Sequence, residues 1–329
     1  MIERKEELVT VFGGDGFIGR YVCEYLFRSG VRVWVASRDP RNSYFIQPLG
    51  QVGQFGFVKA DITKPVAVRE ALKSATAAIN LCGTFGKRMH ATHVDGARNV
   101  AEAAVEAGVD ALVHISAIGA SAESPSAYGK TKAEGEALVR EAFPTATLVR
   151  PSLVFGPEDA LFNRFAGMAR LMPIMPVVCG DTRFQPVYVG DLADAVMAAS
   201  ARQDAIGVVY ELGGPRVWQF RELLAYILKE TGRKRRLVDI PIGLARLQAR
   251  FMELVPGKPL TRDQLLMLQQ DNVAAADMPG LHELGIVPTP VELVVPSYLR
   301  RFRPGGGTRR VPPQEPNRGA TDLSLHTKD

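Results

Sequence analysis

The sequence predicts an α/β protein: a Rossmann-type, doubly wound parallel sheet with a small, mostly helical C-terminal cap. Three observations support this prediction. Short β-rich runs alternate with helical stretches through the first half of the chain, a glycine-rich turn follows the first run, and the alternation is lost after Arg150. We therefore expect a nucleotide-binding core over residues 1–150, a cap over residues 151–303 and a disordered basic tail over residues 304–329.

The predicted strands of the core are short and apolar, as in a parallel sheet that helices cover on both faces. We expect them at residues 8–12, 31–35, 77–81, 111–115 and 146–149. Helices are expected between them at residues 18–29, 92–107 and 128–142. The first two of these stop at Gly30 and Gly108, because glycine readily ends a helix.

The cap begins with a segment that Pro151, Pro157, Pro173 and Pro176 interrupt. Helices are expected after it at residues 220–231, 244–254 and 261–272, and residues 208–210 are expected to return to the sheet. From Arg300 onward the chain holds seven basic and three acidic side chains among prolines and glycines, and such a segment cannot bury a core. The rest of the chain is nearly neutral, so nucleic acid is not an expected partner.

The composition is that of a globular protein, with 46% hydrophobic and 23% charged residues. No run of about 18 apolar residues predicts a membrane span. The charged start leads directly into the first strand, so no signal peptide is expected. Three scattered cysteines suit a reducing compartment. We expect a cytoplasmic protein.

A glycine-rich turn lies between the first strand and the first helix, with Gly13, Gly16 and Gly19 three residues apart. Glycine supplies the backbone freedom that the turn needs, and a side chain at the middle position would block a pyrophosphate. Phe17 and Ile18 open the helix, whose N-terminal N–H groups attract phosphates. These five residues are therefore predicted to bind a dinucleotide.

The end of the second strand bears on the choice of cofactor. An acidic residue there would bind a ribose hydroxyl and favour NAD, whereas this chain has Ser37 and Arg38. A guanidinium matches the 2′-phosphate of NADP, so NADP(H) is the preferred cofactor. NAD(H) is the alternative, should Asp39 rather than Arg38 face the ribose. Asp61 and Ile62 follow the next strand-like run, where a contact to the adenine edge is expected.

Tyr128 and Lys132 are four residues apart and share one face of a predicted helix. An ammonium close to a phenol stabilises the phenolate, so we expect Lys132 to lower the pKa of Tyr128. Ser116 ends the strand before this helix, where its hydroxyl could polarise a substrate carbonyl. Tyr128, Lys132 and Ser116 are the candidate catalytic residues. His90, His93 and His114 have no metal-ligand partners at suitable spacing, so no metal site is predicted.

At these residues the chain resembles the extended, atypical short-chain dehydrogenase/reductase superfamily. The resemblance rests on Gly13-Gly14-Asp15-Gly16-Phe17-Ile18-Gly19, Asn80-Leu81-Cys82-Gly83, Ser116, Tyr128 with Lys132, and Arg150-Pro151-Ser152-Leu153-Val154-Phe155-Gly156. It implies contacts to the nicotinamide side of the cofactor from Asn80, Cys82, Gly83, Pro151 and Val154. Cys82 departs from the usual pattern, and we interpret it as a small buried filler rather than a reactive thiol.

Within the superfamily, the C-terminal half is similar to the NADP-binding accessory subunits of respiratory complex I and their bacterial relatives. The similarity lies in residues 143–165, Thr261-Arg262-Asp263-Gln264, residues 279–286, residues 288–293 and Leu299-Arg300-Arg301-Phe302-Arg303. It implies a tightly held structural NADPH, partners among complex I subunits or in the quinone pathway, and a bacterial protein peripheral at the cytoplasmic face of the inner membrane.

Two other functions remain open. One is an active reductase or epimerase that acts on a quinone-like or other small substrate, with a role in ubiquinone metabolism. The other is a regulator that binds NADP and controls a partner. The same residues can hold a cofactor with or without turnover, so the sequence does not choose among these functions.

Overall fold

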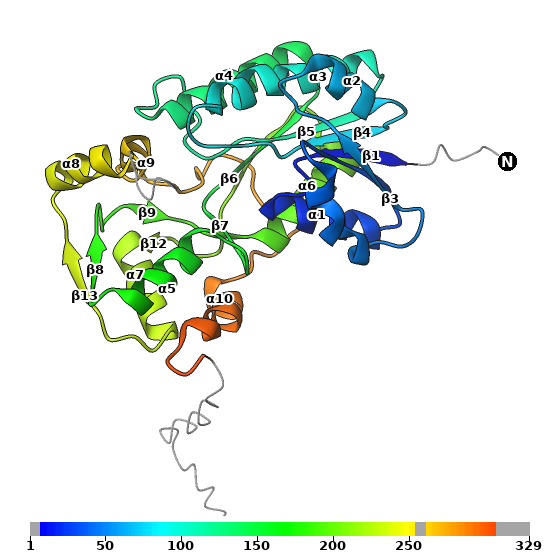
Figure 1. Cartoon of the computed structure of the whole chain (residues 1–329). Coiled ribbons are helices and arrows are strands. Elements are labelled where there is room, and N and C mark those ends of the chain that lie inside the picture. The colour runs from blue at the N-terminus through cyan, green and yellow to red at the C-terminus, as the bar shows by residue number, and fades with distance from the viewer. Residues whose placement is uncertain (1–6, 254–260, 307–329) are drawn as a thin grey trace, which may run out of the picture.

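The computed structural model describes residues 7–253 and 261–306. Its centre is a sheet of seven parallel strands in the order β11-β6-β5-β4-β1-β2-β3 (Figure 1). The strands are β1 (Leu8–Phe12), β2 (Arg32–Ser37), β3 (Phe55–Lys59), β4 (Ala77–Asn80), β5 (Ala111–Ile115), β6 (Thr147–Pro151) and β11 (Val209–Leu212). The order reverses between β1 and β4, and ligands of open α/β sheets bind where the strands end at such a reversal.

Helices cover both faces of this sheet (Figure 1). One face carries α1 (Phe17–Arg28) and α6 (Val189–Ala201), which pack against each other; the other carries α2 (Pro65–Leu72), α3 (Gly96–Glu106) and α4 (Ala127–Ala142). Within β1, Val11 joins the core under α1 and α6, while its neighbour Phe12 joins the core under α2 and α3. Successive side chains of a strand point to opposite faces, which is why every residue of β1 is buried.

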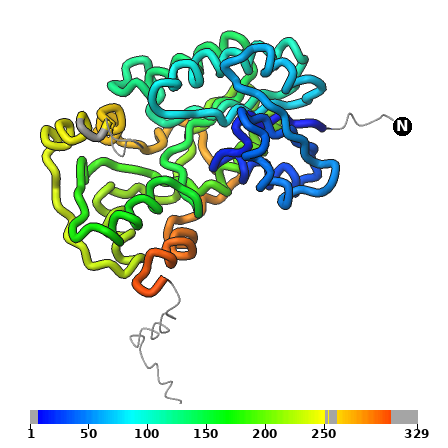
Figure 2. The backbone as a smooth tube through the Cα atoms, in the orientation of Figure 1, coloured from blue at the N-terminus to red at the C-terminus, as the bar shows by residue number. Residues whose placement is uncertain are grey.

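The cap forms a second lobe beside the sheet (Figure 2). Its helices are α5 (Leu161–Leu171), α7 (Phe220–Glu230), α8 (Ile242–Met252), α9 (Arg262–Met267) and α10 (Val291–Leu299). Its strands are β7 (Val154–Phe155), β8 (Ile174–Val177), β9 (Arg183–Phe184), β10 (Val187–Tyr188), β12 (Trp218–Gln219) and β13 (Arg236–Asp239). Phe155, Phe162, Leu223 and Leu224 belong to its own buried core.

Most predicted elements of the core are confirmed. The strands at residues 8–12 and 111–115 have the predicted bounds, and residues 209–212 return to the sheet as β11 beside β6. The second strand begins at Arg32, one residue later than predicted, and continues to Ser37. The helix expected from residue 92 opens with a π-helical turn, Ala91–Asp95, before α3 begins.

The cap differs from the prediction in two respects. It contains three short strand pairs, β7 with β10, β8 with β13 and β9 with β12, in addition to its helices. The helix predicted over residues 261–272 ends at Met267, because Asn272 forms a bridge with Phe184 of β9 and donates its N–H to the carbonyl of Arg183 (2.8 Å). Almost all of the predicted tail lies outside the described residues. Within residues 7–253 and 261–306, no helix has the length and apolar character to cross a bilayer.

Candidate nucleotide-binding and acid–base site

The glycine turn after β1 is built from backbone contacts. Gly13 has a φ of +76°, which favours glycine, and its N–H donates to the carbonyl of Ala36 (3.0 Å). A Cβ at Gly19 would lie 2.2 Å from the carbonyl oxygen of Gly13, so the helix can approach the loop only without a side chain there. A Cβ at Gly16 would meet only that same oxygen, at 3.2 Å. Gly16 therefore faces open space, where a pyrophosphate would fit.

The first turn of α1 offers donors to such a ligand. Gly16 is the N-cap residue, no side chain caps the helix, and its first turn holds no acidic residue. The N–H groups of a helix N-terminus that lack a capping side chain, together with the helix dipole, favour an anion. Phe17 and Ile18 begin the helix, as the sequence predicts, and the ring of Phe17 packs near Gly156 of the cap.

At the end of β2, one of two neighbouring charges is already paired. The carboxylate of Asp39 accepts two hydrogen bonds from the guanidinium of Arg41 (both 2.9 Å), and these bonds lower the pKa of Asp39. Arg38 is exposed and makes no hydrogen bond or ion pair with the residues that the structure describes. Ser37 is buried, and its hydroxyl pairs with that of Ser43 (3.0 Å). The guanidinium of Arg38 thus has no hydrogen bond or ion pair in the described chain, although its charge acts on the carboxylate of Asp15 in the glycine turn.

Asp61 and Ile62 lie just beyond β3. The carboxylate of Asp61 accepts hydrogen bonds from Arg88 (2.7 Å) and from the hydroxyl of Thr63 (2.8 Å). Burial opposes ionisation, but these bonds lower the pKa of Asp61 overall. Ile62 is buried, and a Cβ at Gly96 would lie 2.5 Å from it. The predicted adenine contact thus remains a prediction, and the Asp61 side chain already has partners.

Tyr128 and Lys132 lie on α4, as predicted. The ammonium of Lys132 is buried and donates to the carbonyl of Ile115 (3.0 Å), and burial lowers its pKa to about 8. The Tyr128 ring stacks on Phe85, with centroids 4.8 Å apart, and meets His93 edge-on at 5.3 Å. Burial raises the pKa of Tyr128 to about 12, opposite to the shift expected from Lys132.

Two buried polar atoms at the C-terminal end of β5 lack partners in the described chain. Asn80 bonds to Nδ1 of His114 (3.2 Å), while Nε2 of His114 and Oγ of Ser116 have no hydrogen-bond partner in the described chain. Burial lowers the pKa of His114 to about 3, so the ring is neutral. Buried polar atoms are normally hydrogen-bonded. An unpartnered hydroxyl at Ser116, one residue after the carbonyl that holds Lys132, therefore fits a ligand with a polar group.

The loop after β4 lies between the glycine turn and Lys132. Cys82 donates its N–H to the side chain of Asn80 (3.1 Å), and a Cβ at Gly13 would lie 3.3 Å from its sulfur. Cys82 is half-buried, and burial raises the pKa of its thiol to about 12, so the thiol is protonated at neutral pH. A Cβ at Gly83 would lie 3.6 Å from Nζ of Lys132. This loop, with Asn80, Cys82 and Gly83, thus connects the glycine turn with the Tyr128–Lys132 pair.

Segments of the cap also reach this site, through contacts that the sequence did not reveal. The carboxylate of Asp263 in α9 accepts hydrogen bonds from the N–H groups of Ala127 (2.6 Å) and Tyr128 (3.2 Å), at the start of α4. The N-cap residue of this helix is Ser126, whose hydroxyl accepts the N–H of Gly129 (3.0 Å). Asp263 therefore supplements this cap from 135 residues away, at the helix that carries Tyr128 and Lys132. In the sequence, Asp263 stands out only as part of Thr261-Arg262-Asp263-Gln264, and this stretch does not predict a contact with α4.

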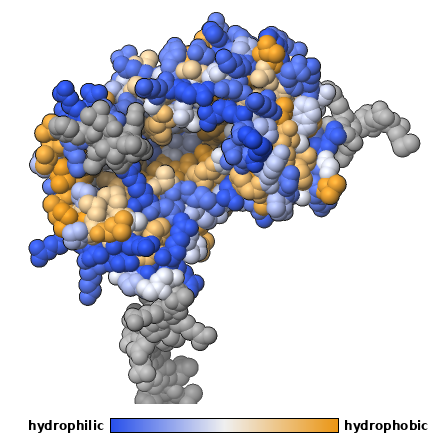
Figure 3. All heavy atoms as spheres, viewed as in Figure 1, coloured by the Kyte–Doolittle hydropathy of each residue, from blue (hydrophilic) through white to orange (hydrophobic). Residues whose placement is uncertain are grey.

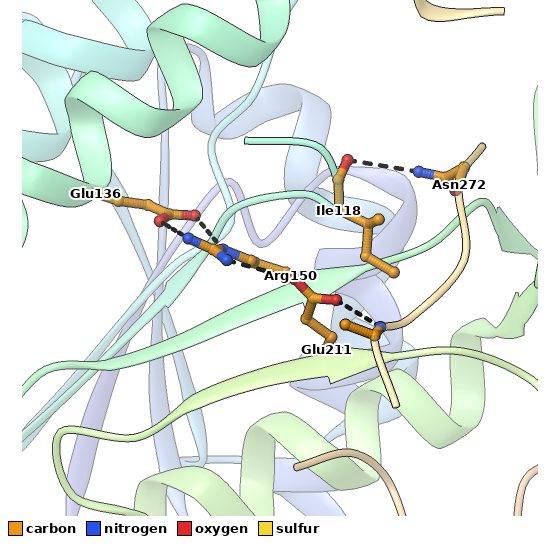
Figure 4. Close-up of polar contacts among 6 residues, drawn as sticks. Ile118, Glu136, Arg150, Glu211 and Asn272 are labelled. Atoms are coloured by element: carbon orange, nitrogen blue, oxygen red, sulfur yellow. Dashed lines mark hydrogen bonds and ion pairs between the residues drawn. The ribbon is translucent and has the colours of Figure 1, made fainter. Parts of the chain in front are cut away.

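A network of charged side chains joins α4, the sheet edge at β11 and the stretch after α9 that contains Asn272 and Ala275, here called the C-terminal segment (Figure 4). Arg150 in β6 bonds to both oxygens of Glu136 (2.9 and 2.6 Å) and to Glu211 of β11 (3.4 Å). Glu211 in turn accepts the N–H of Ala275 (3.0 Å). Glu136 lies one turn beyond Lys132 and favours its charged form. The network therefore ties the lysine's helix to the C-terminal segment.

Asn272 makes a second connection from this segment. Its side chain donates to the carbonyl of Ile118 (3.4 Å; Figure 4) and accepts from the hydroxyl of Ser152 (2.7 Å) and the N–H of Leu153 (2.8 Å). The carbonyl of Pro151 accepts the N–H of Ile118 (3.1 Å). Pro151, a predicted cofactor contact, therefore lies beside the loop that follows Ser116, whereas Val154, another predicted contact, is half-buried in β7 and pairs with Val187 of β10.

A glycine turn at the reversal of a parallel sheet, followed by a serine, a tyrosine and a lysine at the same end, defines an NAD(P)-binding protein of the extended short-chain dehydrogenase/reductase type. The sequence profile of the NAD dependent epimerase/dehydratase family matches residues 9–213. The chain belongs to this family.

Two relatives and one solved structure are similar to this chain. The chain is 34% identical over 303 residues to the NADH dehydrogenase [ubiquinone] 1 alpha subcomplex subunit 9 of Mus musculus, covering 90% of this chain and 80% of that protein. It is 31% identical over 241 residues to a ceramide reductase of Caulobacter vibrioides, covering 71% and 74%. Its fold matches an NADPH-dependent quinone oxidoreductase of Escherichia coli, solved with NADPH, with a TM-score of 0.73 and 20% identity over 88% of this chain and 99% of that one.

Proposed function

We propose that this protein binds NADP(H) in preference to NAD(H) and holds it as a structural cofactor, in a role like that of the complex I accessory subunits. The free charge at Arg38 is the observation that supports the cofactor preference. A 2′-phosphate would gain charge-assisted hydrogen bonds from this guanidinium. A ribose 2′-hydroxyl would find the Asp39 carboxylate already occupied by Arg41.

Similarity that extends into the cap supports the accessory role. The match to the mouse subunit covers 90% of this chain, well beyond the residues that the family profile matches. On this basis the partners are subunits of respiratory complex I, and the protein is peripheral at the cytoplasmic face of the inner membrane of a bacterium. As a structural cofactor, NADP(H) would stabilise the native state by about 4 kcal/mol at a thousandfold excess over its Kd, because it binds only that state.

The test begins with purification, release of the bound nucleotide and its identification. Arg38→Ala should weaken NADP(H) binding by tenfold or more, about 1.4 kcal/mol, and leave NAD(H) binding almost unchanged. Arg69→Ala is the matched control, because Arg69 is an exposed arginine of α2 whose ion pair with Glu106 is long (3.7 Å). Equal losses for both nucleotides would show that Arg38 is not the ligand of the 2′-phosphate.

A second candidate function is an active NAD(P)H-dependent reductase. The unpartnered, buried hydroxyl of Ser116 favours it, since this group can donate to the carbonyl oxygen of a substrate. At neutral pH a Tyr128 with a pKa of about 12 is protonated and can give its proton to that oxygen as negative charge develops. A bound nicotinamide would supply the hydride. The substrate would be a small carbonyl or quinone-like compound.

Tyr128→Phe separates the two functions, because it removes the transferable proton and keeps the ring. In a reductase, turnover with quinone analogues should fall by about 10²–10⁴-fold while nucleotide binding persists. In the structural role, the same variant should support assembly of complex I as well as the wild type does, and Gly16→Ala should impair it by removing the nucleotide. Wild-type turnover that Tyr128→Phe abolishes, with assembly indifferent to Gly16→Ala, would contradict the structural role.

A further inference from the structure

A basic hollow lies in the cap, where α7 ends and the chain turns at Gly232 into β13. Its volume is about 380 Å³. Figure 3 shows hydrophilic side chains gathered along the lower edge of the cap. Four cationic residues line the hollow over an apolar floor: Lys229, Arg233, Lys234 and Arg235, with Ala225, Leu228 and Leu237 beneath.

Two of these cations are held in place by uncharged partners. Arg233 donates from Nε and Nη2 to the carbonyl of Phe302 (3.3 and 3.1 Å), and Arg235 donates from Nε to the carbonyl of Ala169 (3.0 Å). A carbonyl fixes a guanidinium without cancelling its charge. Since each guanidinium has five N–H donors, both arginines keep donors for a further partner.

The two lysines add positive charge that is not compensated nearby. Lys229 and Lys234 are exposed and make no ion pair within the described part of the chain. Glu230, next to Lys229, is engaged by Arg303. A cation in the last turn of a helix interacts favourably with the carbonyl end of that helix, which accounts for the position of Lys229 at the end of α7. It does not account for Arg233 and Arg235, because these arginines bond to carbonyls of other elements. The hollow therefore concentrates more positive charge than its own fold requires.

We propose that this hollow is a binding site for a phosphate-bearing ligand, separate from the nucleotide site and beyond the function proposed above. Fixed guanidiniums bind phosphate oxygens through parallel, charge-assisted hydrogen bonds, and lysines add point charges. The floor of Ala225, Leu228 and Leu237 suits the carbon part next to a phosphate. The ligand is thus a phosphate ester, from either a soluble compound or the headgroup of a lipid.

The test uses the full chain saturated with NADP⁺, so that the nucleotide site is filled. Lys229→Gln/Lys234→Gln removes two exposed charges of the hollow and no described hydrogen bond. The control Lys64→Gln/Lys73→Gln removes the same charge from the N-cap and C-cap positions of α2, on the opposite lobe, together with the ion pair between Lys73 and Glu70 (2.6 Å). Pyrophosphate is titrated calorimetrically, and each protein is also sedimented with phosphatidylcholine vesicles that contain either none or about one third phosphatidylglycerol.

We expect the hollow variant, but not the control, to bind one of the two probes about fivefold or more weakly. Weaker pyrophosphate binding with unchanged vesicle binding identifies a soluble phosphate ester. Weaker binding to the anionic vesicles alone identifies a lipid headgroup. The proposal is overturned if neither probe binds the wild type, or if both bind the hollow variant and the control equally. Unchanged NADP⁺ affinity in both variants shows that they are folded.

Discussion

The two halves of the candidate site are constructed differently. The nucleotide half, around the glycine turn and Arg38, is formed mainly by one β–α–β unit, residues 8–38, and the backbone hydrogen bonds of Gly13 and Gly16 stay within that unit. The acid–base half, around Tyr128 and Lys132, depends on residues from distant parts of the chain. Asp263 caps its helix, and the network through Arg150 and Glu211 extends from this helix to Ala275.

This difference has a consequence for how the halves respond to change. A short local unit is specified mainly by its own sequence, so disturbing α9 of the cap should leave nucleotide binding largely intact. The acid–base half shares its hydrogen bonds with the cap, so disturbing the cap should alter the geometry of Tyr128 before it alters the glycine turn.

The largest effect is expected at Gly19. Its Cβ would lie 2.2 Å from a carbonyl oxygen and 2.5 Å from the Cα of Gly14, and backbone atoms cannot move aside cheaply. Gly19→Ala should lower the free energy of unfolding by about 3 kcal/mol or more, even without nucleotide. Chemical denaturation of the nucleotide-free protein measures this loss.

Gly16→Ala is the matched control within the same turn. Its Cβ would meet only the Gly13 oxygen, at 3.2 Å, so the nucleotide-free protein should lose less than about 1 kcal/mol. Nucleotide occupancy should fall, because the methyl group would occupy the space that faces the pyrophosphate. Similar stability losses for Gly16→Ala and Gly19→Ala would show that Gly16, like Gly19, is required for the packing of the turn and not only for nucleotide binding.

Acid should weaken the acid–base half first. Burial, helped by the charge of Lys132, lowers the pKa values of His93 and His114 to about 3, whereas an unfolded histidine titrates near 6.5. The unfolded chain therefore binds more protons below pH 6.5, and stability that is complete above that pH is lost as the pH falls toward 3. Each histidine should cost about 2 kcal/mol between pH 7 and pH 5.

His114→Asn isolates one of these contributions. Urea denaturation at pH 7 and pH 5 should show a loss about 2 kcal/mol smaller in His114→Asn than in the wild type. His90→Asn, at an exposed histidine, should behave as the wild type. If His114→Asn loses as much stability on acidification as the wild type, His114 is not held neutral by the fold.

The smallest effect is expected at the contact between cap and helix. Asp263→Ala removes the acceptor for two N–H groups at the start of α4, and loss of a helix cap costs about 1 kcal/mol. Amide hydrogen exchange at Ala127 and Tyr128 should become faster, while NADP(H) affinity stays the same. Asp277→Ala, at an exposed aspartate of the same segment, is the control. A loss of NADP(H) affinity in Asp263→Ala would break the separation of the halves.

The sequence predicted the local structure better than the long-range structure. The bounds of β1 and β5 were predicted because each is a five-residue run whose apolar side chains pack against helices on both faces of the sheet. The helix predicted through Asn272 was too long because that residue pairs with β9, a contact that helix propensity does not contain. Asp263 was missed for the same reason, since its partners lie 135 and 136 residues earlier.

The pKa of Tyr128 illustrates a related limit. The spacing of Tyr128 and Lys132 correctly placed both residues on α4, but the direction of the pKa shift depends on burial and on where the ammonium bonds. Lys132 donates to the carbonyl of Ile115, and the phenol is surrounded by Phe85 and His93. Spacing along a helix gives proximity, whereas the tertiary environment decides the charge state.

The position of β11 has a consequence for synthesis of the chain. This strand pairs with β6 along Leu148, Val149, Arg150 and Pro151, yet it is made about sixty residues after β6. Until then, β6 is an unpaired edge on a growing polypeptide, and Arg150 lacks its partner Glu211. Unpaired edges invite association between chains, so a fragment that ends before residue 209 should recruit chaperones, and a chain in which Leu212 has also left the ribosome should release them.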